Sequence, residues 1–139
     1  MADERTQVEV NLIGDIIDVP APDMLIVGSA GAGYTDILHV ISEGALKRGT
    51  LLMSMAGSDD FTLCTAAGLS SAQVFAVLAE PVVIGENEYA DTAGYLAGEF
   101  NADLVIFPWE TEDDNHDDLV ELARSALRNS GILLRKVVK

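Results

Sequence analysis

The stretch YTDILHVISEGALKRGTLLMS, residues 34–54, gives the clearest indication of how this chain folds. Its first nine residues are rich in β-forming side chains and end at Glu43-Gly44, a pair typical of turns. Residues 45–54 continue as a turn that leads into a second strand. The presence of glycine at position 49 in that turn indicates a backbone conformation that a Cβ atom would obstruct. The stretch therefore predicts two strands with a tight connection between them.

Similar short segments recur on both sides of this stretch, with turn residues between them. We expect strands at residues 7–13, 24–28, 61–67, 73–83, 95–100, 103–107 and 132–138. Pro81 interrupts one of them and favours a sheet edge or a bulge. We expect turns at 55–60 and 67–71 and a long polar loop at 85–94. The strands do not alternate with helices, which argues against a nucleotide-binding parallel sheet.

One strong helical pattern appears late in the sequence, between Asp113 and Gly131. Its expected apolar face consists of Leu119, Leu122, Ala123, Ala126 and Leu127. Asp113, Asp114 or Asn115 can cap its start, and acidic residues occupy its first turns, where the helix dipole favours negative charge. We predict a mainly β (α+β) domain over residues 23–139 with one short C-terminal helix.

Residues 1–22 predict an extended N-terminal arm. Residues 7–13 alternate between apolar and polar side chains, which is typical of a strand with one buried face. Pro20 and Pro22 then favour an extended connector. The alternative is that residues 7–13 form an ordinary first strand of the domain.

The composition excludes several classes of protein. The 139 residues include 23 acidic and 8 basic side chains, which give a net charge of -15. Such a chain is a poor candidate for binding nucleic acid or an anionic membrane, because both need basic side chains. We expect no signal peptide and no membrane span. Five of the eight basic residues lie in the last sixteen positions, which predicts a basic C-terminal end on an acidic body.

No pattern in the sequence predicts catalysis, a metal or a cofactor. His39 lies in an apolar run and is expected in the core, whereas His116 is expected in solvent, and their spacing is not that of a metal site. Cys64 is expected to act as a small hydrophobic residue. Residues 28–33 lack the lysine of a phosphate-binding loop, and the acidic residues from Glu110 to Asp118 lack EF-hand spacing.

Four short segments follow one another in a characteristic order. They are LKRGTLL (46–52), AVLAE (76–80), GEFN (98–101) and GILLR (131–135). Over residues 24–139, their order resembles the bacteriophage head decoration family, the lambda D-like capsid-stabilising proteins. The resemblance implies a β-clip-like subunit without catalytic activity that forms homotrimers.

The same resemblance implies a place in a virion. Proteins of this family bind the outside of an expanded icosahedral head at three-fold positions and stabilise it against the pressure of packaged DNA. The implied partners are the major capsid protein and further copies of the chain, with no nucleic acid, membrane or cofactor. The implied location is the exterior of the capsid, with the host cytoplasm during assembly.

Site residues follow from combining this resemblance with the sequence pattern. The face of the arm expected to bind the capsid consists of Val8, Val10, Leu12 and Ile13. The candidate inter-subunit contacts are Lys47, Arg48, Glu99, Phe100 and Asn101. The two basic residues of this set are the only ones between residues 6 and 123, and a solvated turn is the alternative for them.

Two other functions stay open on the sequence alone. The acidic loops fit a small ligand- or metal-binding β domain. The acidity also fits an interaction domain in an assembly of a halophile.

Overall fold

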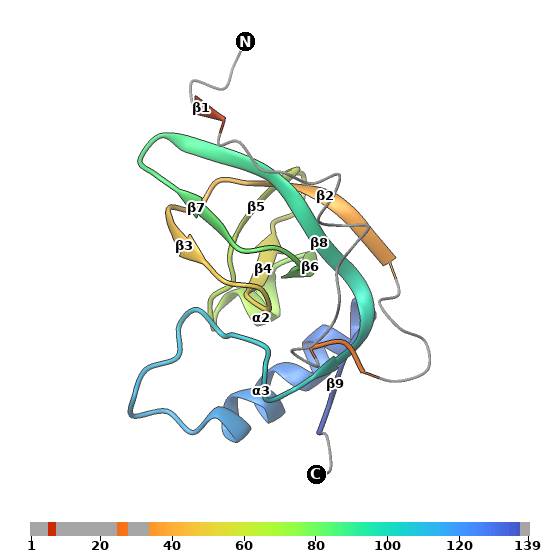
Figure 1. The fold of residues 1–139 in the computed structure, drawn as a ribbon. Coiled ribbons are helices and arrows are strands. Elements are labelled where there is room, and N and C mark those ends of the chain that lie inside the picture. Colours follow the sequence, from red (N-terminus) through yellow and green to blue (C-terminus); the bar gives the residue numbers. More distant parts are fainter. Residues whose placement is uncertain (1–5, 8–24, 28–33, 137–139) are drawn as a thin grey trace.

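The fold was obtained as a computed structural model, which describes residues 6–7, 25–27 and 34–136 (Figure 1). The predicted mainly-β fold is confirmed. The elements are β1 (Thr6–Gln7), β2 (Tyr34–Val40), β3 (Gly44–Leu46), β4 (Leu51–Ser54), β5 (Asp60–Leu63), α2 (Gly68–Ser71), β6 (Val74–Leu78), β7 (Val82–Ile84), β8 (Glu88–Asn101), α3 (His116–Asn129) and β9 (Ile132–Arg135).

Strand β8 organises the structure and curves along one side of it (Figure 1). Antiparallel pairings join β2 to β8, β8 to β6, β6 to β4 and β4 to β5, and β5 returns to β2 in parallel. These pairings close the strands into a ring, so that side chains alternate between its interior and its outer face. The two ends of β8 carry further parallel partners, β1 at its start and β9 at its end. Strands β3 and β7 form a separate two-stranded ribbon.

Two apolar clusters follow from the alternation along the strands. The cluster inside the ring consists of Leu38, Val40, Leu52, Phe61, Ala76, Leu78 and Ala90, with Leu46, Val82 and Ile84 from the ribbon. The second cluster covers the outer face of β4, β6 and β8 with α3, β9 and the loop that precedes α3. Neighbouring residues of one strand therefore serve different clusters: Leu51 packs toward α3 and Leu52 packs inside the ring.

The prediction of a polar loop at 85–94 is wrong for most of that segment, because β8 begins at Glu88. The alternating residues Ala90, Thr92 and Gly94 lie on its inner face, where small side chains leave room for the opposite strands. A Cβ atom at Gly94 would lie 2.1 Å from the Leu38 side chain. The alternation is therefore typical of a strand, but its small residues hide the apolar signal.

Other predicted boundaries also change. Residues 103–107 are not a strand: they begin within a turn, and Ile106 then forms an isolated bridge with Thr50. Residues 68–71 form a one-turn helix where a turn was expected, β5 ends at Leu63, and β9 ends at Arg135. Pro81 does separate β6 from β7.

Two local predictions are confirmed. Gly49 has φ +100°, and a Cβ atom there would lie 2.7 Å from the Leu104 carbonyl oxygen. Asn115 caps α3, since its side chain accepts a hydrogen bond from the Asp117 N–H at 2.9 Å. The helix buries Val120, Ala123 and Leu127, whereas Leu122 is 59% exposed and does not belong to the buried face.

Candidate interaction surface

The described N-terminal residues attach to both ends of β8. Thr6 and Gln7 pair in parallel with Glu88 and Tyr89. At the other end, Ile26 bridges to Phe100, and the Leu25 carbonyl accepts a hydrogen bond from the Asn101 N–H at 2.7 Å. Leu25 is 1% exposed, so its buried side chain attaches this segment to the core of the domain. The predicted capsid-binding residues Val8, Val10, Leu12 and Ile13 lie outside the described residues.

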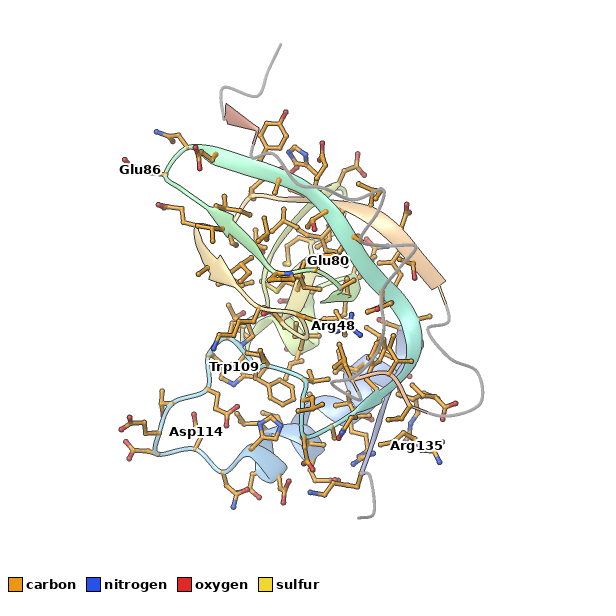
Figure 2. All side chains as sticks on the ribbon, viewed as in Figure 1. Arg48, Glu80, Glu86, Trp109, Asp114 and Arg135 are labelled. Carbon is orange, nitrogen blue, oxygen red and sulfur yellow. The ribbon has the colours of Figure 1, made fainter. Side chains whose placement is uncertain are left out.

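The two basic residues of the LKRGT turn have different surroundings. Lys47 is exposed. Arg48, which is labelled in Figure 2, is half-buried. Its Nη1 donates hydrogen bonds to the Ala79 carbonyl at 2.9 Å and to the Tyr95 hydroxyl at 2.8 Å. Its guanidinium carbon also lies 5.6 Å from the centre of the Tyr95 ring. Arg48 therefore ties the turn to β8 and to the end of β6 within one subunit.

The GEFN segment forms the end of β8 and is mostly enclosed. Glu99 pairs with Arg135 across the β8–β9 ladder. Phe100 is fully buried, with its ring centre 5.5 Å from that of Tyr95. Asn101 is 8% exposed and accepts a hydrogen bond from the Asp103 N–H. The expectation that Phe100 contacts a neighbouring subunit is thus corrected, because its side chain belongs to the core and reaches no surface.

An unforeseen cluster lies on the outer face of β2 and β8, next to β1. His39 Nδ1 lies 2.9 Å from Asp91 Oδ1, its Nε2 lies 3.8 Å from Asp60, and its ring stacks on Tyr89 at 4.4 Å. Ile37, on the same face, is 49% exposed. The expected core position of His39 is therefore wrong. Tyr89 and Asp91 are two positions apart in β8 and therefore lie on the same face of the strand. This spacing is the sequence feature that could have predicted their position beside His39.

His116 is also placed differently from the prediction, since it is held by hydrogen bonds and not solvated. Its Nδ1 lies 2.9 Å from Glu110 Oε1, its Nε2 lies 2.8 Å from the Ala102 carbonyl oxygen, and its ring packs on Phe107. Burial by itself would lower the pKa of His116. The hydrogen bonds to Ala102 and Glu110 and the nearby carboxylates outweigh burial, so the pKa is raised. Because both ring nitrogens face acceptors, this geometry favours the imidazolium, which fastens the loop before α3.

Replacing His116 with glutamine is expected to reduce stability most at acidic pH. The pKa in the folded state lies above the ordinary value of 6.5, so the stabilisation is complete below that pH and is lost as the pH rises through the raised pKa. We expect a loss of roughly 1.5–3 kcal/mol at low pH, as for hydrogen bonds to charged groups. Urea unfolding of both proteins across this pH range measures the difference. A difference that does not change with pH would contradict a charged His116.

Cys64 is a free, buried cysteine. Desolvation by burial raises the pKa of its thiol to about 12, so the thiol stays protonated at neutral pH and is a poor nucleophile. In the described ranges 6–7, 25–27 and 34–136, no three His, Cys, Asp or Glu side chains are grouped to hold a metal ion. The helices within these ranges are too short or too polar to cross a membrane.

No protein-family model matches the chain, and no curated protein matches it.

Proposed function

We propose that this chain is a capsid decoration protein. In this proposal it binds the outer surface of an expanded viral head, as homotrimers at three-fold positions. It stabilises the head against the internal pressure of DNA. Its partners are the major capsid protein and further copies of itself, it has no cofactor and no catalytic activity, and its place is the exterior of the virion.

The observation that carries the proposal is the attachment of N-terminal residues to a sheet edge. Thr6 and Gln7 add a short parallel strand to the start of β8. A strand added in this way binds through main-chain hydrogen bonds, which an extended segment can form with any free edge. The alternating residues that follow, from Val8 onward, fit the same kind of contact with a capsid subunit.

The ring of strands also supports this proposal, because its strands are paired with one another and leave few backbone groups unpaired at strand edges. Each of its strands pairs on both sides over at least part of its length. The ribbon of β3 and β7 is a separate sheet. Its Leu46, Val82 and Ile84 pack into the cluster inside the ring, whereas its Val83 is 68% exposed. We therefore expect the N-terminal segment and the ribbon to contact the shell, and we expect no catalytic pocket to take part in the function.

A homotrimer strengthens such contacts by linking three of them. Once one arm is bound, the others bind intramolecularly, which can raise affinity by roughly 10²–10⁴. A protein that binds only the expanded shell stabilises that state by its differential affinity. This is how a small protein without enzymatic activity can resist internal pressure.

Co-sedimentation with shells tests the proposal. Shells of the major capsid protein encoded in the same genome are mixed with the purified chain before and after expansion. We expect saturable binding to expanded shells and at least tenfold weaker binding to the precursor, a difference of about 1.4 kcal/mol. Absence of binding to expanded shells would contradict the proposal. A melting temperature that rises with a metal ion or small ligand would favour the alternative of a ligand-binding domain.

A further inference from the structure

A basic pocket lies between α3 and β9, at the C-terminal end of the helix. It has a volume of about 260 Å³ and is lined by Arg124, Arg128, Leu133, Leu134 and Arg135. In a chain with a net charge of -15, three arginines beside one pocket are a strong local contrast. Leu133, which is 38% exposed, adds an apolar wall.

The three arginines differ in how far they are engaged. Arg124 donates to the Leu134 carbonyl at 2.6 Å and pairs with Glu121. Arg135 pairs with Glu99. Arg128 is exposed and, among the residues that the structure describes, its side chain makes no hydrogen bond or ion pair. The pocket therefore has two fixed arginines and one that is available to a carboxylate, which guanidinium binds through two parallel hydrogen bonds.

Carboxylates of complementary charge lie at the opposite end of α3. Glu112 and Asp113 are exposed in the loop before the helix, and within the described part of the chain they have no polar partner. The loop is well fixed, because Asp114 accepts hydrogen bonds from the Thr111 N–H and hydroxyl, and His116 is bonded to Glu110. Figure 2 shows Asp114 and Arg135 on opposite sides of the molecule, with α3 between them.

We propose that the arginine pocket of one subunit binds Glu112 and Asp113 of a second copy. Because the two surfaces lie on opposite sides of the molecule, this contact joins copies head to tail, and its repetition gives a ring or an open chain. The high negative charge of the rest of the surface disfavours other orientations.

This inference rests on the self-association that is part of the proposed function and names the contact responsible for it. It does not involve the shell, so it is tested on the purified full-length chain. If copies do not associate through this contact, the chain can still bind expanded shells, and if the chain does not bind shells, this contact can still join copies.

Sedimentation velocity over a concentration series provides the test. We expect the wild-type chain to associate, and we expect Arg128→Glu and Asp113→Lys each to weaken association at least about tenfold by replacing attraction with repulsion. The double variant Arg128→Glu with Asp113→Lys restores the pair with exchanged charges and is expected to associate like the wild type.

A matched control separates the contact from net charge. Asp59→Lys changes the charge by the same amount as Asp113→Lys, at an exposed position in a different loop, and is expected to leave association at least as strong. A wild-type chain that stays monomeric at its highest soluble concentration would overturn the inference. Single variants that associate like the wild type, or a double variant that stays as weak as the single ones, would also overturn it.

Discussion

Replacing Phe100 with alanine is expected to lower the free energy of unfolding by about 3–5 kcal/mol, the usual cost for a large buried aromatic side chain. Phe100 is fully buried where β8 meets β9 and the Ile26 bridge, and its ring packs against Tyr95. Truncation removes these contacts and leaves a cavity that the paired strands cannot close easily. Urea unfolding followed by circular dichroism measures the change through the shift of the midpoint.

The control for this prediction is Val83→Ala. Val83 is 68% exposed on the β3–β7 ribbon, so its truncation is expected to change stability by about 0.5 kcal/mol or less. If Phe100→Ala unfolded at the wild-type urea concentration and weakened only self-association, Phe100 would be the inter-subunit contact that the sequence suggested, and its assignment to the core would be wrong.

Deleting residues 1–22 is expected to weaken binding to expanded shells by at least roughly 10²–10⁴, because it removes the contacts of all three arms together with the gain that their simultaneous attachment supplies. The remaining chain keeps Leu25, its hydrogen bond from Asn101 and the whole ring of strands, so it is expected to stay folded. Titration of shells with the truncated and full-length chains measures the loss.

A shorter deletion of residues 1–5 is the matched control. It keeps Thr6 and Gln7, which pair with β8, and the alternating residues that follow. It is expected to bind shells like the full-length chain. Equal binding by the chain that lacks residues 1–22 would show that the arm is not the attachment, and loss of its cooperative unfolding would show that the segment stabilises the domain itself.

Much of the fold can be predicted from local sequence, because strand, turn and capping preferences act over a few residues. Gly49, Pro81 and the cap of α3 are of this kind. The start of β8 is not, since Ala90, Thr92 and Gly94 are small for a reason that only the packed ring reveals: the opposite side chains need their space. Closure of the ring depends on pairings between segments that are distant in sequence, and the sequence of any one segment does not predict these pairings.

The candidate site is less predictable than the fold for a related reason. The sequence indicated a basic C-terminal region, but the pocket of Arg124, Arg128 and Arg135 forms only when β9 lies beside α3. Arg48 and His116 have partners that are distant in sequence or belong to the backbone, and spacing alone does not identify them. Phe100 occurs in a short motif that says nothing about burial, which depends on the packing of β9 and α3 around it.

Electron cryo-microscopy of expanded heads saturated with the chain tests the proposed function most directly. The predicted result is additional density on the outer surface at three-fold positions, into which the ring of strands and α3 fit. Heads that bear no such external density, although the chain is present in excess, would contradict the assignment of this protein to capsid decoration.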